Sequence, residues 1–328
     1  MREKINLWTD RVLAGGSLTG EEGLALLNLQ GADLGYLFAG AQYLRETFIG
    51  REIALCSIIN AKSGLCQEDC AFCAQSAHHQ ADPPVYGLKP VDEIVAGARE
   101  AEGRGCRCFG IVTSGSRIEP GEEMAGVISA IREIRATTSI RPSASLGLLD
   151  RSAADALADA GCVTYHHNLE TARSFFPEIC TTHDYEQDVE TVLLAKAAGM
   201  KVCCGGIFGL GESLRQRVEL ALTLRELEVD SVPLNFLVPV TGTPLGAMRD
   251  LTPMDCLRIV ALYRYLLPDR HISVCGGRET NLREYQSWIF LAGASGVMVG
   301  NYLTRRGREL EDDLRMIRDG ELQHGSRC

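Results

Sequence analysis

Three cysteines lie within a few positions of one another in the stretch GLCQEDCAFCAQS. Cys66, Cys70 and Cys73 have the spacing C-x3-C-x2-C, and thiolates this close together are typical of metal ligands. A structural zinc site closes with four ligands, usually two separated C-x2-C pairs, whereas this stretch offers one such pair and no matching histidine pair. A cubane iron–sulfur cluster fits better. It takes one thiolate per iron, so three cysteines leave one iron open.

The rest of the composition limits what these cysteines can do. The N-terminus, MREKINLWTDRVLAGG, lacks the apolar segment of a signal peptide, and no apolar run predicts a membrane span, so we expect a cytoplasmic protein. In that reducing compartment the thirteen cysteines are expected to be metal ligands, catalytic groups or small buried side chains. The formal net charge of -10 argues against nucleic acid as the main partner.

The elements that must position the cysteines alternate along the chain. Residues 1 to 50 are predicted to be helical, with Thr19 as an N-cap, and amphipathic segments with helical spacing follow each later apolar run. These helices are predicted at 121–135, 150–160, 185–198, 212–227, 252–267 and 280–291, and a charged, solvated helix at 305–320. The short β-rich runs lie at 53–59, 106–112, 140–146, 162–168, 201–207, 231–238, 271–275 and 295–299.

Eight strands that alternate with helices predict an α/β fold, a closed (β/α)8 TIM-type barrel with an N-terminal helical extension. An open doubly wound sheet would be expected to carry a glycine-rich G-x-G-x-x-G turn after its first strand, and the cysteine stretch stands there instead. We expect the extension at 1–50, the barrel at 51–319 and a C-terminal tail at 320–328.

The position of C-x3-C-x2-C directly after the first strand resembles the radical S-adenosylmethionine (SAM) superfamily. In that superfamily the open iron of a [4Fe-4S] cluster binds SAM, and an electron from the cluster cleaves it to methionine and a 5′-deoxyadenosyl radical. The resemblance therefore assigns Cys66, Cys70 and Cys73 to the cluster. The alternative is three unrelated buried cysteines.

Five stretches narrow the resemblance to the biotin synthase family. SGLCQEDCAFCAQS is similar to that family's cysteine signature, and the other four follow in the family's order from about residue 10 to 319. They are YHHNLET (165–171), KVCCGGIFGLGES (201–213), SVPLNFLVPVTGTPL (231–245) and GGRETN (276–281). The resemblance implies conversion of dethiobiotin to biotin. Breaking two unactivated C–H bonds and inserting sulfur needs a radical rather than an acid–base group.

The resemblance also assigns roles to individual positions. Asn168 would contact SAM and the ureido ring of dethiobiotin, and Asn235 would make a second ureido contact. Glu170, where the family usually has Asp, would bind the ribose hydroxyls. The backbone of Gly206, Ile207 and Gly209 would flank the adenine. A flavodoxin or ferredoxin as electron donor and a homodimer are further implications of the family.

One part of the family pattern is missing. Typical members hold a second cluster, [2Fe-2S], on three cysteines and an arginine. Two of these cysteines match Cys108 and Cys203, but the third position is Ser143 and the arginine position is Ser273. The usual [2Fe-2S] site cannot form on this set.

Alternation along the strands suggests a replacement, because residues two positions apart face the same side. If Cys108 and Ser273 face the barrel interior, as the resemblance implies, then Cys106 and Cys275 do so too. The interior then holds the four thiols of Cys106, Cys108, Cys203 and Cys275, enough for an auxiliary four-iron cluster as sulfur donor. The alternative is that Cys106 and Cys275 are small core residues.

Two other functions stay open at this point. One is another radical SAM enzyme of the same subfamily, such as a hydrogenase-cofactor maturase or a mutase. The other is a non-catalytic iron–sulfur carrier, which would need neither the SAM-binding stretch nor a whole barrel.

Overall fold

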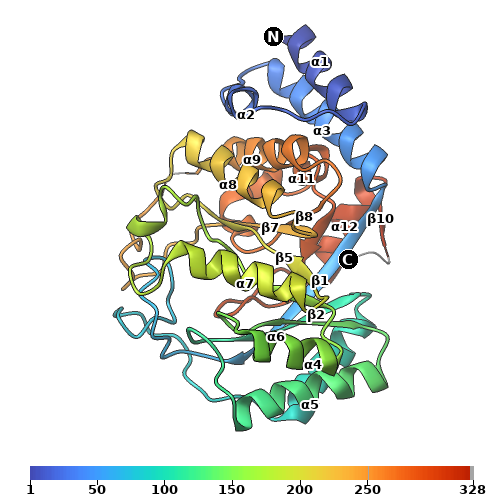
Figure 1. The fold of residues 1–328 in the computed structure, drawn as a ribbon. Helices are drawn as coiled ribbons and strands as arrows, with labels where there is room; N and C mark the ends of the chain where they lie inside the picture. The colour runs from blue at the N-terminus through green and yellow to red at the C-terminus, as the bar shows by residue number, and fades with distance from the viewer. Residues whose placement is uncertain (250, 326–328) are drawn as a thin grey trace.

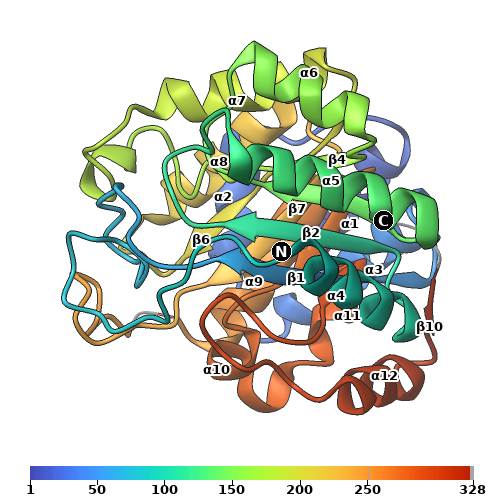
Figure 2. The same cartoon turned by 90° about the horizontal axis from the view of Figure 1, so that it is seen from below.

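The computed structural model describes residues 1–249 and 251–325. Eight parallel strands close into a barrel, because β1 pairs with both β2 and β9 and the others pair in the order β2-β3-β4-β5-β7-β8-β9. The predicted (β/α)8 barrel is confirmed (Figures 1 and 2). Its strands are β1 (Glu52–Lys62), β2 (Cys108–Thr113), β3 (Arg141–Ser145), β4 (Thr164–His166), β5 (Lys201–Cys203) with β6 (Gly206–Phe208), β7 (Ser231–Phe236), β8 (His271–Val274) and β9 (Gly296–Met298).

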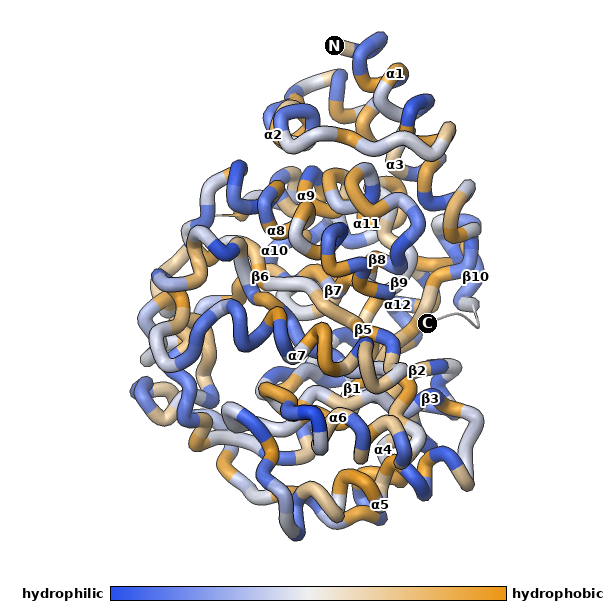
Figure 3. The backbone as a smooth tube through the Cα atoms, in the orientation of Figure 1, coloured by the Kyte–Doolittle hydropathy of each residue, from blue (hydrophilic) through white to orange (hydrophobic). Residues whose placement is uncertain are grey.

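Helices surround the barrel, as Figure 2 shows for α4 to α7. Hydrophobic and hydrophilic positions alternate along these helices, whereas stretches of the central strands are hydrophobic (Figure 3). The main core therefore lies between the strands and the inner helix faces. The helices are α4 (Val91–Gly103), α5 (Glu122–Thr137), α6 (Arg151–Ala160), α7 (Tyr185–Ala197), α8 (Leu214–Glu226), α9 (Pro253–Leu266), α10 (Arg278–Leu282), α11 (Trp288–Leu291) and α12 (Leu310–Asp319), with short 3-10 turns η1 (Phe176–Glu178) and η2 (Arg283–Tyr285).

The first fifty residues form three helices, α1 (Arg2–Leu13), α2 (Gly20–Leu27) and α3 (Asp33–Phe48). The predicted cap at Thr19 is confirmed, since its hydroxyl accepts a hydrogen bond from the Glu22 amide at 3.2 Å. These helices pack on α8, α9 and α11, outside the barrel wall (Figure 1). At the other end, β10 (Gln323–His324) pairs with the start of β1.

Two predicted helices differ in the structure. The single helix predicted at 280–291 is wrong. Arg283, with φ of 50°, follows α10 and leaves the right-handed helical conformation, so the segment breaks into α10, η2 and α11. The helix predicted at 305–320 starts only at Leu310, and it is not simply solvated, because Asp313, Met316 and Ile317 are buried. Within residues 1–249 and 251–325, no helix combines the length and apolar character needed to cross a bilayer.

Candidate active site

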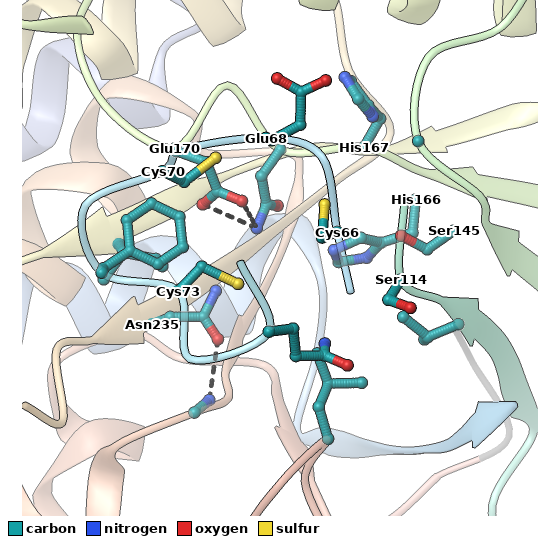
Figure 4. A pocket seen from close by; sticks show the side chains of 18 of the residues that line it. Cys66, Glu68, Cys70, Cys73, Ser114, Ser145, His166, His167, Glu170 and Asn235 are labelled. Atoms are coloured by element: carbon teal, nitrogen blue, oxygen red, sulfur yellow. Dashed lines mark hydrogen bonds between the residues drawn. The ribbon is translucent and has the colours of Figure 1, made fainter. Parts of the chain in front are cut away.

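A cavity of about 480 Å³ lies at the carboxyl ends of the barrel strands. In a parallel barrel all strands end at this face, so side chains that are far apart in sequence meet there. Its lining includes the three clustered cysteines and several predicted binding residues (Figure 4). They are Cys66, Cys70, Cys73, Asn168, Glu170, Ile207, Asn235 and Cys275.

The loop that carries the three cysteines is held by hydrogen bonds at both ends. The Cys66 amide donates to the Gln75 carbonyl at 2.9 Å, and the Cys73 amide donates to the Cys70 carbonyl at 2.9 Å. The Gln75 side chain is buried and accepts from the Ser63 hydroxyl at 2.9 Å. These bonds fix the loop over the mouth of the barrel.

The three thiols fit a cluster with one open iron. Cys66, Cys70 and Cys73 are free thiols of one loop, and all line the same cavity. Burial raises the pKa of Cys73 to about 11, so this sulfur stays protonated until a metal displaces the proton. Glu68 and Cys180 line the cavity next to them.

Asn168 and Asn235 are held in place by backbone contacts. The Asn168 oxygen accepts from the Gly205 amide at 3.2 Å, and the Asn235 oxygen accepts from the Gly276 amide at 2.9 Å. The Asn235 amide group donates to the Gly206 carbonyl at 3.3 Å. A carboxamide has two donor hydrogens and two acceptor lone pairs, so each side chain keeps capacity to bind a ligand.

Glu170 lies beside Asn168, whose amide donates to the Glu170 carboxylate at 3.3 Å. Burial raises the pKa of Glu170 to about 8, and the nearby Asp188 charge acts in the same direction. The backbone of Glu170 has φ of 59° and accepts a hydrogen bond from the Ile207 amide at 2.8 Å. The carboxyl group is thus turned toward the cavity by a constrained backbone.

The two histidines that precede Asn168 have different surroundings. His166 lines the cavity, and burial lowers its pKa to about 4, so the ring is neutral at physiological pH. His167 contacts Asp188 at 2.7 Å, and Asp188 also contacts His183 at 3.2 Å. Burial opposes protonation of His183, but its contacts with Asp188, Cys180 and Glu68 raise its pKa to about 11.

Several cysteines gather inside the barrel below this cavity. The thiols of Cys56 and Cys275 are in hydrogen-bonding contact, and Cys203 is close enough to both to interact with them electrostatically. Cys56 lies beside Cys108 in the register of β1 and β2. Burial raises the pKa of Cys203 to about 12, as expected for a thiol deep in a barrel.

The predicted interior residues differ in their surroundings. Cys275 lines the cavity, whereas Cys106 precedes β2, is only 1% exposed and packs in the main hydrophobic core. Ser143 also lines the cavity, and its hydroxyl contacts the Phe109 carbonyl at 3.3 Å. Ser273 lies close to Gly296 of β9. A Cβ atom added to Gly296 would lie 2.4 Å from the Ser273 hydroxyl oxygen.

Two of the predicted adenine-flanking residues, Gly206 and Ile207, lie on β6, and Gly209 follows the end of this strand. Ile207 lines the cavity, and Gly206 bridges to Glu170 in the strand register. Gly209 has φ of 88°, and its amide donates to the Glu212 carboxylate at 3.0 Å. This accounts for the acidic residue in the stretch GIFGLGE, since Glu212 also accepts from Leu210 at 2.8 Å.

Two residues of the site were missed by the sequence analysis. The sequence analysis assigns no role to Cys56, although Cys56 lies two residues before Ile58, which lines the cavity, and therefore on the inner face. The sequence analysis assigns no role to Cys180 either, which lies after β4 and η1 in the long connection to α7. Strand alternation could have found Cys56, whereas nothing in the spacing indicates Cys180. Cys328, to which the sequence analysis assigns no role, lies outside the described residues.

The comparisons with known proteins agree with this geometry. The Radical SAM superfamily matches residues 62–224, and the Biotin and Thiamin Synthesis associated domain matches residues 233–323. Biotin synthase of Syntrophotalea carbinolica is 63% identical over 328 residues, the whole of both chains. Biotin synthase of Trichlorobacter lovleyi is 62% identical over 315 residues, 96% of this chain and 95% of the relative.

Solved structures confirm the fold alone, because their sequences are distant. Methylornithine synthase (PylB) has a TM-score of 0.85 at 19% identity and covers 97% of both chains. The hydrogenase maturase HydG has a TM-score of 0.85 at 18% identity and covers all of this chain and 76% of its own. With its barrel, its cysteine loop and full-length relatives well above half identity, the chain belongs to the biotin synthase family of radical SAM enzymes.

Proposed function

We propose that the protein converts dethiobiotin to biotin, with sulfur taken from an interior iron–sulfur cluster of four-iron type. The observation that carries the proposal is full-length identity of 63% to a biotin synthase, together with interior thiols where the family's usual ligand set is incomplete. The three-cysteine loop alone supports only membership of the radical SAM superfamily and does not indicate the substrate.

Cys66, Cys70 and Cys73 would hold the [4Fe-4S] cluster that, when bound with SAM, supplies the deoxyadenosyl radical. The chain's own contribution is binding, orientation and exclusion of water. Asn168 and Asn235 would donate to and accept from the cyclic urea of dethiobiotin through the capacity that their backbone contacts leave free. Glu170, with Gly206, Ile207 and Gly209, would bind the adenosyl part of SAM.

The interior thiols would hold the auxiliary cluster. Cys203 and Cys275 are proposed as two of its ligands, with Cys106 as another from strand alternation. Cys108 is proposed from the family resemblance, and because its sulfur is disulfide-bonded in this structure it must be reduced before it can bind iron. Cys56 is a competing fourth ligand, because its thiol contacts Cys275 while Cys106 packs in the hydrophobic core. Serine at positions 143 and 273 leaves more room in this interior than the cysteine and arginine of the usual pattern.

The activity test mixes the anaerobic, reduced protein with SAM and dethiobiotin. We expect both 5′-deoxyadenosine and biotin, measured by mass spectrometry. Formation of deoxyadenosine without biotin would contradict dethiobiotin as the substrate and favour another radical SAM reaction. The absence of both products would favour an iron–sulfur carrier. A reduced flavodoxin or ferredoxin is the expected electron donor in this assay.

The cluster test counts iron and sulfide in the anaerobically reconstituted protein. Two four-iron clusters give about eight irons per chain, whereas about six or four would contradict the four-iron auxiliary site. Cys275→Ala should lose about half of the iron. The same loss in Cys56→Ala but not in Cys106→Ala would identify Cys56 as the fourth ligand, and the reverse result would identify Cys106.

Two further expectations follow from the family. We propose a homodimer in the cytoplasm, with no nucleic acid or membrane partner. Light scattering of the purified, cluster-loaded protein measures the assembly, and a mass near 35.7 kDa rather than twice that value would contradict the dimer.

A further inference from the structure

The cavity at the carboxyl ends of the strands is poor in positive charge. Three carboxylate side chains line it, those of Glu68, Glu170 and Asp188. Among residues 1–249 and 251–325, Arg305 is the single arginine or lysine in its wall. Carboxylates repel an anionic group that enters such a cavity, whereas a guanidinium attracts it. The distribution of charge therefore favours Arg305 as the contact for a negatively charged end of a ligand.

His183 also lines the cavity, but its ring is already engaged. Its Nδ1 atom is 2.7 Å from the Glu68 carboxylate, and its Nε2 atom is 3.2 Å from the Asp188 carboxylate. A ring held by two acids has no N–H group left for a ligand. The Arg305 side chain, in contrast, has no hydrogen bond or ion pair with any residue that the structure describes, so its N–H donors stay available.

The turn that carries Arg305 is fixed on the barrel between β9 and α12. The Tyr302 amide donates to the Arg305 carbonyl at 2.9 Å, and the Tyr302 hydroxyl donates to the Glu279 carboxylate at 2.8 Å. The Asn60 side chain of β1 donates to the Leu303 carbonyl at 2.9 Å. These bonds hold the backbone of Arg305 at the cavity, and its side chain is exposed at the rim.

The same wall offers the other contacts that an amphipathic acid needs. Asn235 supplies a carboxamide, and the apolar side chains of Leu237, Val238 and Leu303 also line the cavity. Dethiobiotin combines a polar cyclic urea, an apolar alkyl chain and a terminal carboxylate. The cavity thus has one kind of side chain for each part of this molecule, with Arg305 for the carboxylate.

From these observations we propose that Arg305 binds the carboxylate of the substrate and selects a substrate that carries one. A guanidinium and a carboxylate form two parallel N–H···O hydrogen bonds, which a neutral ester cannot match. The inference rests on the proposed conversion of dethiobiotin and adds the residue that recognises its acidic end. SAM brings a second carboxylate to the site, so the affinity for SAM must be measured beside that for dethiobiotin.

The experiment measures binding by isothermal titration calorimetry, with the cluster-loaded protein under anaerobic conditions. SAM is present and no reductant is added, so that no turnover occurs. Dethiobiotin and its methyl ester are the two ligands. Arg305→Gln should weaken the binding of dethiobiotin about tenfold and leave that of the ester unchanged, because only the acid loses a charged partner. Arg305→Lys keeps the charge but not the planar fork, so its affinity for dethiobiotin should lie between the two.

Arg306→Gln is the matched control, because Arg306 is the next residue, does not line the cavity and pairs with Glu309 at the surface. Its affinity for dethiobiotin should equal that of the unmodified protein. Equal affinity of Arg305→Gln and the unmodified protein for dethiobiotin would overturn the proposal. An equal loss of affinity for the ester, or a loss of affinity for SAM, would overturn it as well.

Biotin formation by the unmodified protein tests the proposed function separately. If biotin is formed and Arg305→Gln binds dethiobiotin normally, only the role of Arg305 is refuted. If the unmodified protein does not bind dethiobiotin, both the role of Arg305 and the proposed function are refuted.

Discussion

Glu170 shows how a single position combines backbone constraint with an unusual charge state. Its φ of 59° is uncommon for a residue with a side chain, and the strand register to Gly206 holds it there. Burial raises the pKa of its carboxyl group to about 8 from an ordinary value of 4.5. A neutral carboxyl can both donate and accept, which suits the hydroxyls of a ribose.

This raised pKa predicts a pH dependence of stability. Between about pH 4.5 and pH 8 the folded protein keeps a proton that the unfolded chain has released, so stability falls as pH rises through this window. Glu170→Gln removes the titrating carboxyl group. The free energy of unfolding of this variant, relative to that of the unmodified protein, should therefore increase from pH 5 to pH 8, by at most about 1.4 kcal/mol per pH unit.

Denaturant unfolding of the cluster-free protein at several pH values measures this difference. Glu178→Gln is a suitable control, because Glu178 lies on η1 and is exposed. A stability difference between Glu170→Gln and the unmodified protein that stays constant across pH would contradict a raised pKa.

The same positions show what could be predicted from the chain alone. Cys66, Cys70 and Cys73 are predictable because their spacing is local, and Asn168 and Asn235 because they lie in recognisable strand-end stretches. The contact of Cys180 with Cys70 joins residues 110 positions apart through loop packing. No local periodicity encodes such a contact, so sequence reasoning passed over it.

Among the elements, the strand at 201–208 is the least regular part of the barrel wall. It is interrupted between β5 and β6, where Gly205 lies against β7. A Cβ at Gly205 would meet the Pro233 carbonyl oxygen at 2.0 Å. Cys203 ends β5 in the interior, and Ile207 of β6 lines the cavity beyond the break.

Gly205→Ala should therefore force β5 and β6 away from β7 and destabilise the fold by several kcal/mol, comparable with other overpacked sites. Gly35→Ala is the matched control. Gly35 is within α3, and an added Cβ meets nothing within 4 Å, so this change should stabilise by about 0.5–1 kcal/mol. Thermal unfolding compares the two, and equal melting temperatures would contradict the close approach.

The helix predicted at 280–291 shows where the periodicity of apolar residues fails to predict an element correctly. Its apolar spacing is helical, but the positive φ of Arg283 ends the helix after Leu282. The spacing of apolar residues predicts which face of a helix is buried. It does not predict a positive φ at a residue that is neither glycine nor asparagine, such as Arg283. The eight strands were predictable because each is a short apolar run bounded by turns.

At the level of the whole chain, a buried ion pair connects the last helix to the barrel. Arg278, at the start of α10, and Asp313 of α12 are both fully buried, with Nη2 and Oδ2 2.5 Å apart. Arg278 also donates to Gln286 at 2.7 Å, and its charge reaches Cys56 and Cys275 in the barrel interior. The C-terminal helix is therefore joined to the same region as the interior thiols.

Asp313→Asn should destabilise the protein by about 3–5 kcal/mol, because it leaves the buried Arg278 charge with only the more distant Glu279 carboxylate, at 3.8 Å, as its partner. Asp312→Asn on the same helix is the control. Asp312 pairs with Arg315 at 2.6 Å on the surface, and loss of such a pair costs about 0–1 kcal/mol. Chemical denaturation of both variants measures the difference. If the two lose equal stability, the buried pair does not hold α12 on the barrel, and the C-terminal segment is anchored by the buried Met316 and Ile317 and by the pairing of β10 with β1.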